Sequence, residues 1–427
     1  MNRTPTPADS DDPQAEYNAF VNRHLTRNVS AQVVNGMFGQ TGFRLVQAPT
    51  FLPAYLFALS GSDFAVGLAR SLQAAGTVAS PVIGASMIGH RTHILGTMLT
   101  VGVLMRLQIL GMALAGFLLA TTPTLYVVIL MLTLMGFFQG MYQVTQNSLR
   151  AKVIPVNKRG VVTGIRNFLA GLSSAAVSYI AGAYIIEQDL FGDGYATVFT
   201  LAFIIGMAGL LALATTKEPG SVTVKQKESV KGTLRLLPGL LRDDPAFAKF
   251  FYARALASFG RMAMPFYILF AASRMEISGS ALGLLTTVWM ITSSVTNIFW
   301  GLLADRRGYR IVMIATLALW TLSHVQLLFT HDLSGMIIFF IIMGLAQGGF
   351  AQASQNMVME FGRTEDIPLR LAASGTAVNL IGTIGPVMGG LIAMGSYQAL
   401  FITCIVLQLI ALAIIIRTVP EPRSLRY

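Results

Sequence analysis

Long apolar runs separated by short polar connections are the feature that most constrains the fold of this chain. A helix that crosses a membrane needs about 20 mainly apolar residues, and about twelve runs reach that length. The runs are continuous and do not alternate between apolar and polar residues, which excludes a barrel of strands. The sequence therefore predicts an all-α polytopic membrane protein. The runs cover residues 29–59, 63–88, 94–120, 124–148, 160–186, 195–216, 247–273, 279–303, 309–330, 334–358, 370–393 and 396–417.

The composition excludes the soluble alternatives. Hydrophobic residues make up 54% of the 427 residues and charged residues only 11%, with a mean hydropathy of +0.64. A soluble domain carries about 25% charged residues, because its surface must be covered. The same composition excludes a disordered chain and a coiled coil. Cys404 is the only cysteine, so there is no internal disulfide and no cysteine-rich metal site.

The basic residues, which give a net charge of +11, fall on alternate connections. This pattern follows the positive-inside rule, so we expect both termini in the cytoplasm and no nucleic-acid partner. For a bacterial chain the membrane would be the inner membrane. The basic connections carry His90, Arg91 and His93; Arg150, Lys152, Lys158 and Arg159; Arg306, Arg307 and Arg310; and Arg363 and Arg370. The other connections carry Asp63, Glu187, Asp189, Asp193, Glu276 and Asp332, with Arg274 as the one basic exception.

The two halves of the chain repeat each other at an offset of about 210 residues. The fourth run contains Met135-Gly136 and Gln139-Gly140, and the tenth contains Met343-Gly344 and Gln347-Gly348. The first run has Pro53-Ala54-Tyr55, and the seventh has Pro265-Phe266-Tyr267. A duplicated six-helix unit is therefore predicted. The expected organisation is a cytoplasmic tail (1–28), an N-terminal bundle (29–216), a cytoplasmic linker (217–246), a C-terminal bundle (247–417) and a cytoplasmic tail (418–427).

The connection between the eighth and ninth runs reads Gly-Leu-Leu-Ala-Asp-Arg-Arg-Gly-Tyr-Arg over residues 301–310. With the repeat, it resembles the signature loop of the major facilitator superfamily. The resemblance implies two pseudo-symmetric six-helix bundles that work by alternating access. The first-half copy, residues 84–93, departs from the pattern because Ile88 stands where the acid belongs.

An acid among arginines beside a tight glycine turn can pair with the neighbouring bundle in one conformation only. We therefore predict that this loop forms a cytoplasmic gate. The predicted gating residues are Gly301, Asp305, Arg306, Gly308 and Arg310.

Polar side chains recur at helical spacing inside several runs. Because residues at i, i+4 and i+7 share a helix face, these sets form stripes. They are Gln40, Arg44 and Gln47; Gln139, Gln143 and Gln146; Arg254, Ser258 and Arg261; and the broader set Gln347, Gln352 and Gln355. They fall on the first, fourth, seventh and tenth runs, which line the central cavity in the family that the chain resembles.

Arginines inside the runs suggest an anion site, since a charge at a helix centre costs at least about 2.5–3.5 kcal/mol. Arg44 and Arg261 are the predicted substrate anchors, with hydrogen bonds from Gln40, Gln139, Gln143 and Gln347. The alternative is that these side chains are polar contacts between helices. Near the helix ends, Arg166 and Arg254 could instead extend toward water. Arg70 could support the site from the outer mouth, and Arg106 has no partner that the sequence identifies.

Acidic residues are absent from the middle of every run, although proton-driven porters commonly carry one there. His324 is the only histidine within the runs and is a candidate proton carrier, or else a packing residue. The distribution favours a transporter of a small organic anion or zwitterion, either secondary active or facilitative. Two alternatives stay open: efflux of drugs or lipophiles, and a receptor or a lipid- or pigment-handling factor on a transporter fold.

No enzyme is indicated, because the sequence has no phosphate-binding loop, zinc-ligand spacing or nucleophile elbow. No cofactor and no metal is expected. The expected partners are a small-molecule substrate and the lipid bilayer, and a monomer is the simplest state consistent with the sequence.

Overall fold

A computed structural model describes residues 13–89, 91–220, 239–361 and 367–424. Every regular element in these ranges is a helix, which confirms the predicted all-α fold. His90, Arg363, most of the predicted linker (221–238) and the outermost parts of both predicted tails (1–12 and 425–427) lie outside the described residues.

The elements of the first half run from α1 to α8. They are α1 (Pro13–Arg23), α2 (Leu25–Gln47), α3 (Phe51–Ser60), α4 (Asp63–Ile88), α5 (Leu95–Leu118), α6 (Thr121–Val153), α7 (Val156–Ile180), the π-helical turn η1 (Ala181–Ile186), η2 (Leu190–Gly192) and α8 (Gly194–Ala214). Those of the second half are α10 (Pro245–Phe259), η3 (Met264–Phe266), α11 (Tyr267–Ala272), α12 (Gly279–Arg307), α13 (Tyr309–Leu328), α14 (Leu333–Glu360), α15 (Ile367–Gly395), α16 (Tyr397–Thr418) and η5 (Pro422–Ser424).

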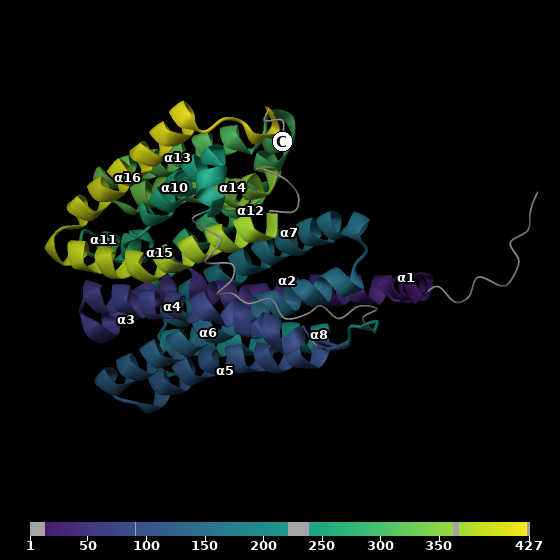
Figure 1. The fold of residues 1–427 in the computed structure, drawn as a ribbon. Coiled ribbons are helices and arrows are strands. Elements are labelled where there is room, and N and C mark those ends of the chain that lie inside the picture. The colour runs from purple at the N-terminus through teal and green to yellow at the C-terminus, as the bar shows by residue number, and fades with distance from the viewer. Residues whose placement is uncertain (1–12, 90, 221–238, 362–366, 425–427) are drawn as a thin grey trace, which may run out of the picture.

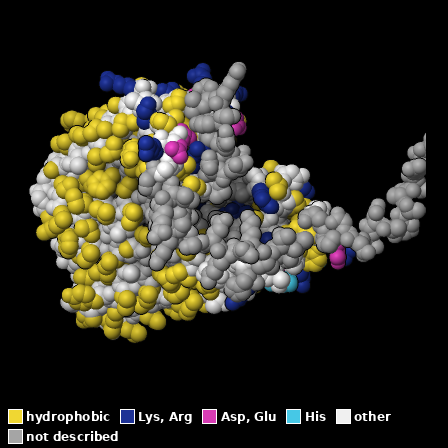
Figure 2. All heavy atoms as spheres, viewed as in Figure 1, with side chains coloured by type: hydrophobic (Ala, Val, Ile, Leu, Met, Phe, Trp, Pro, Cys, Tyr) yellow, Lys and Arg dark blue, Asp and Glu magenta, His cyan; other side chains and the backbone are white. Residues whose placement is uncertain are grey.

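Each predicted run corresponds to helix, and ten helical segments of the described chain are long and apolar enough to cross a membrane. The two remaining runs are 29–59, which is divided between α2 and α3, and 63–88, which forms α4 and carries Arg70 and Gln73. Figure 2 shows hydrophobic side chains over the left part of the visible face, with lysine and arginine gathered at its upper edge and right. The chain is an integral, multi-pass membrane protein.

The first membrane segment of each half is broken near its middle. In the first half, α2 ends at Gln47 and α3 begins at Phe51, with Pro49 between them. In the second half, α10 ends at Phe259 and η3 contains Pro265. Proline lacks a backbone N–H and cannot continue the hydrogen-bond ladder. These breaks lie beside the predicted polar stripes, so they set the direction of the site side chains.

The two halves pack side by side along the membrane-spanning direction, with α2–α8 on one side and α10–α16 on the other (Figure 1). Their main contacts are α4 against α15 and α7 against α12. A Cβ at Gly67 would overlap the carbonyl oxygen of Pro386, and one at Gly182 would overlap the backbone of Gly283. Close approach of the helices therefore depends on these glycines.

The halves are closed at one end and separated at the other. We call the end that holds the α4–α5, α6–α7, α12–α13 and α14–α15 connections the basic end, and the opposite end the acidic end. Several hydrogen bonds join the halves toward the acidic end. Among them are Tyr397 to Asp63 at 2.7 Å, the Ser280 backbone N–H to Glu187 at 2.8 Å, and Thr50 with Thr286 at 2.5 Å.

Between α7, α12 and α14 lies a cavity of about 790 Å³. Gly164 of α7 lines this cavity, and a Cβ added there would meet no atom within 4 Å. The conformation is therefore sealed toward the acidic end and open toward the basic end.

Candidate functional site

Two cavities lie along the polar faces of α2 and α6. The first, which we call the N-half cavity, has a volume of about 330 Å³ and is enclosed by α2, α5, α6 and α7. The second, which we call the interface cavity, has a volume of about 340 Å³ and is enclosed by helices of both halves. The polar lining of the first includes Gln40, Arg44, Arg106, Gln139, Gln143 and Arg166. That of the second includes Gln47, Arg70, Gln73, Gln139, Ser258 and Arg261.

The two predicted anchors therefore line different cavities in this conformation. Arg44 lies in the N-half cavity and Arg261 in the interface cavity, while Gln139 lines both. Arg44 also reaches the boundary between the halves. Its Nη1 would be 3.6 Å from a Cβ at Gly171, a position that faces Ser294 of α12.

The charge in both cavities is positive. Five arginines line them, and neither cavity has Asp or Glu among its described lining residues. Like charges so close together in a poorly solvated place repel one another. An anion is the ligand that relieves this repulsion.

Arg44 and Arg166 compete for one neutral acceptor. Arg44 Nη2 lies 3.3 Å from Oε1 of Gln40. With the Gln40 amide turned, its oxygen instead accepts from Arg166 Nη1 and Nη2 at 3.0 and 2.7 Å. Arg166 does not extend toward water, because its side chain is buried against Gly36 of α2. A second acceptor, such as a bound anion, would satisfy both guanidinium groups at once.

The partner of Arg106 is the peptide backbone. Its Nε donates to the carbonyl of Gly206 at 2.7 Å and its Nη1 to that of Gly102 at 2.9 Å. The guanidinium also lies 5.2 Å from the centre of the Tyr142 ring. Arg106 is thus held in place by neutral groups, a fixed positive charge beside the N-half cavity.

Arg70 and Arg261 differ sharply in how their donors are used. Arg70 donates to the Gln47 and Gln73 side chains and to the Gln47 carbonyl, at 3.0–3.1 Å. Within the described chain, Arg261 has only a contact with the sulfur of Met264 at 3.7 Å and the faces of two aromatic rings, and its Nε has no acceptor. Arg261 is therefore a cation in the interface cavity without an oxygen partner.

The other predicted site residues take separate places. Gln143 lines the N-half cavity. Gln347 lines neither cavity, and its buried Oε1 has no partner within the described chain. His324 is fully buried, 2.9 Å from the Tyr267 hydroxyl and 2.8 Å from the Trp320 carbonyl, and lines neither cavity. Arg254 lines neither of them either.

The predicted gate loop makes its contacts within its own half. Arg310 donates to the carbonyls of Val419 at 2.6 Å and Ile416 at 2.8 Å, at the end of α16. Gly308 has a φ of +83°, and a Cβ there would overlap the Glu421 carboxylate. Arg306 and Asp305 are exposed, and within the described chain the Asp305 carboxylate forms no hydrogen bond or ion pair.

The C-terminal segment beside this loop carries charges that the sequence reasoning missed. Arg423 forms an ion pair with Glu360 at 2.8 Å, which raises the pKa of Arg423, and it donates to the Asp305 carbonyl. Burial raises the pKa of the Glu421 carboxyl, which accepts a backbone hydrogen bond from Arg310.

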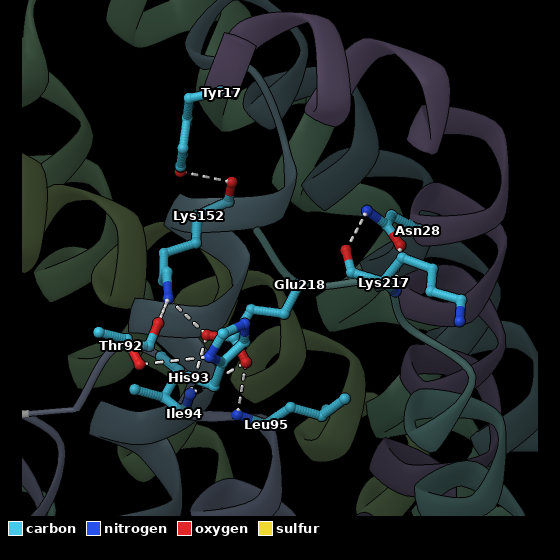
Figure 3. A network of polar contacts seen from close by, with 9 residues as sticks. All are labelled: Tyr17, Asn28, Thr92, His93, Ile94, Leu95, Lys152, Lys217 and Glu218. Carbon is cyan, nitrogen blue, oxygen red and sulfur yellow. Dashed lines mark hydrogen bonds and ion pairs between the residues drawn. The ribbon is translucent and has the colours of Figure 1, made fainter. Parts of the chain in front are cut away.

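The first half has a matching acid, which was also missed. Glu218 follows α8, its side chain is only 3% exposed, and it accepts from the backbone N–H groups of Ile94 and Leu95 at 2.8–2.9 Å (Figure 3). Lys152 at the end of α6 lies 2.5 Å from it and also donates to the Thr92 carbonyl.

Glu218 therefore places a carboxylate at the start of α5, close to the loop whose own acid is replaced by Ile88. Glu421 likewise places a carboxylate at the start of α13. The signal in the sequence was a Glu-Pro pair, 218–219 and 421–422, after the sixth and twelfth runs.

A membrane protein whose two helical halves enclose polar cavities, sealed at one end and open at the other, has the architecture of a secondary transporter. The chain belongs to the Major Facilitator Superfamily, whose sequence model matches residues 31–278 and 250–426. It is a transporter of a small solute and not an enzyme. The family favours this reading over a receptor or a lipid- or pigment-handling factor.

Several solved transporters share the fold. The D-xylose-proton symporter has a TM-score of 0.69 at 13% identity, with 96% of this chain and 100% of that chain covered. The nucleoside transporter NupG has a TM-score of 0.64 at 14% identity, with 93% of this chain and 100% of that chain covered. A bacterial homologue of the human lysosomal transporter Spinster, in an inward-facing and occupied conformation, has a TM-score of 0.65 at 14% identity, with 95% of this chain and 97% of that chain covered.

Among curated proteins, the quinolone resistance protein NorA of Staphylococcus aureus is 22% identical over 148 residues. The match covers 35% of this chain and 38% of NorA, so the chain spans well under half of that relative's length.

Proposed function

We propose that this transporter moves a small organic anion or zwitterion by alternating access, in a secondary active or facilitative manner. The observation that carries the proposal is the lining of the two cavities, with five arginines and, among the described lining residues, no carboxylate. An anion within hydrogen-bond reach offsets the cost of burying these charges. A cation would instead meet repulsion from each of them.

The proposed anchors are Arg44 and Arg261, because these guanidinium groups have the fewest acceptors of their own. Gln40, Gln139 and Gln143 line the N-half cavity with amides that orient the solute. Gln347 would join them in a conformation that turns its buried amide toward the cavities. The proposed site does not include His324, which is packed among aromatic rings.

We also propose that the basic end faces the cytoplasm, as the positive-inside rule requires. The termini would then be cytoplasmic and the membrane, in a bacterium, the inner membrane. The conformation described would be open to the cytoplasm, and the two bundles (29–216 and 247–417) would rock about the linker (217–246). One chain contains a whole site, so a monomer suffices.

The gate proposal concerns the loop of Gly301, Asp305, Arg306, Gly308 and Arg310. Since the Asp305 carboxylate is exposed while the basic end is open, it is free to pair when this end closes. Asp305→Asn should slow transport severalfold in proteoliposomes and leave substrate affinity nearly unchanged. A wild-type transport rate in this variant would remove the gate role.

A ligand-binding screen tests the anion proposal. Purified protein is heated with organic anions, organic cations and neutral solutes, and the unfolding midpoint is measured. A ligand at 100 times its dissociation constant stabilises by about 2.7 kcal/mol. Anions should raise the midpoint of the wild type and not that of Arg44→Ala, whereas stabilisation by lipophilic cations alone would overturn the proposal.

Efflux of drugs or lipophiles is the second candidate, favoured by the partial similarity to a quinolone resistance protein. Apolar residues such as Met262, Met264 and Ile381 line part of the interface cavity. If this candidate holds, expression of the chain should raise resistance to lipophilic compounds, and Arg44→Ala should leave that resistance intact.

A further inference from the structure

The unsatisfied positive charge of the cavities is concentrated at two separate places. A guanidinium has five N–H donors. Arg106 and Arg70 use theirs on carbonyl and amide oxygens of the protein. The single amide oxygen of Gln40 accepts from Arg44 in one orientation of the amide and from Arg166 in the other. Arg44 and Arg166 therefore form the first of these two places.

Arg261 is the second place, and it belongs to the other half of the molecule. Its guanidinium lies 4.9 Å from the ring centre of Phe350 and 5.8 Å from that of Trp320. An aromatic face stabilises a cation but does not accept its N–H bonds as a carboxylate does. The donors of Arg261 are therefore open to an anionic group in the interface cavity.

The cavities that hold the two places meet α2 at successive points along its length. Gln40 and Arg44 line the N-half cavity, whereas Gln47 on the same helix lines the interface cavity. At a rise of about 1.5 Å per residue, Gln40 and Gln47 are about 10 Å apart along α2. Gln139 lines both cavities and so lies between them.

We propose that the substrate is an elongated dianion, a solute with an anionic group at each end. This inference rests on the proposed function and narrows its substrate class. One group binds Arg44 and Arg166, and the other binds Arg261. The body between them passes Gln139 and the apolar side chains of the interface cavity. A solute with one anionic group satisfies one place and leaves the other cation unpaired.

The geometry also gives the second group a role in transport. Arg44 and Arg166 lie on α2 and α7 of the first half, and Arg261 lies at the break between α10 and η3 of the second. A dianion that binds both places links the two halves across the interface cavity. It therefore favours closure of the basic end, which a ligand held by one half alone does not.

Matched ligand pairs test the proposal on the purified full-length protein. The dicarboxylates succinate, adipate, suberate and sebacate are compared with the monocarboxylates butyrate, hexanoate, octanoate and decanoate, and bisphosphonates with monophosphonates of equal length. Dissociation constants come from calorimetry. We expect the longer two-ended ligands to bind at least about tenfold tighter than their one-ended partners, a difference of about 1.4 kcal/mol, and succinate to show no such gain.

Two variants assign the second group to its arginine. Arg261→Ala should remove the advantage of two-ended over one-ended ligands. Arg261→Lys keeps the charge and should retain part of the advantage of two-ended ligands. It replaces the alanine variant in this test if that variant is unstable. Arg417→Ala, an exposed arginine on α16, is the matched control and should change neither series.

The outcomes separate this inference from the proposed function. Equal binding of one-ended and two-ended anions at every length would overturn the dianion and leave the anion transporter standing. An advantage for two-ended ligands that survives in both Arg261 variants would overturn the assignment to Arg261. If no anion binds and cations do, both the dianion and the proposed function are wrong.

Discussion

Arg106 illustrates, at the scale of single residues, how a charge is kept among membrane helices without an acid. Only 2% of this residue is exposed, and its donors reach the carbonyls of Gly206 and Gly102. A Cβ at Gly39, Gly102 or Gly206 would lie 3.1–3.3 Å from a guanidinium nitrogen. The absence of side chains at these glycines therefore makes the room in which the guanidinium fits.

A lysine at this position tests the argument. Its single ammonium cannot reproduce a planar fork that reaches two carbonyls on different helices. Arg106→Lys should therefore lose about 1–3 kcal/mol of unfolding free energy, seen as a lower midpoint in thermal unfolding of the purified protein. Arg417→Lys, on the exposed end of α16, is the control and should stay within about 0.5 kcal/mol. Equal midpoints for the two variants would contradict the carbonyl assignment.

At the scale of elements, the acids after α8 and α16 join the end of each half to an earlier helix. Glu218 binds the N-terminus of α5 and the lysine at the end of α6 (Figure 3). A carboxylate at a helix N-terminus satisfies free backbone N–H groups and the positive end of the helix dipole. The end of α8 is thereby fixed to two helices of its own half.

Neutralising this carboxylate should be costly. Glu218→Gln keeps the shape and leaves Lys152 without its ion-pair partner, for which we expect a loss of about 3 kcal/mol or more. The control is Glu360→Gln, whose partner Arg423 is 41% exposed and which should lose less than about 1 kcal/mol. The comparison is made by thermal unfolding of both variants. If Glu218→Gln is no less stable than Glu360→Gln, the buried pair does not hold these helices.

Sequence periodicity predicted the helices well, because each run must satisfy its backbone within the membrane. Two features escaped it. The run 29–59 is two helices, since the chain breaks at Pro49, and the corresponding run 247–273 breaks before Pro265. Glu218 and Glu421 lie outside the runs, in segments where hydropathy carries no information about contacts.

For the site, the helical spacing placed Gln40, Arg44 and Gln143 on interior faces, and all three line the N-half cavity. It could not show that Arg44 and Arg261 line different cavities, or that Gln347 lines neither. Which cavity a side chain reaches depends on how the two halves sit against each other. That arrangement is set by contacts between α4 and α15 and between α7 and α12, which are remote in sequence.

At the scale of the whole molecule, the structure is one state of the alternating-access cycle that we propose. Asp63 and Glu187 accept hydrogen bonds from the other half that seal the acidic end, while the basic end stays apart around a cavity of about 790 Å³. A transporter must also populate the reverse arrangement, and a ligand shifts the balance only by binding the two states differently. In this account an anion between the arginines supplies that difference.

Counterflow in proteoliposomes tests this claim most directly. Vesicles loaded with an organic anion that binds the purified protein are diluted into a trace of the same labelled anion, and accumulation of label is followed for wild type and Arg44→Ala. We expect transient accumulation by the wild type and none by the folded variant. Equal accumulation by both, or accumulation of labelled organic cations instead, would contradict it.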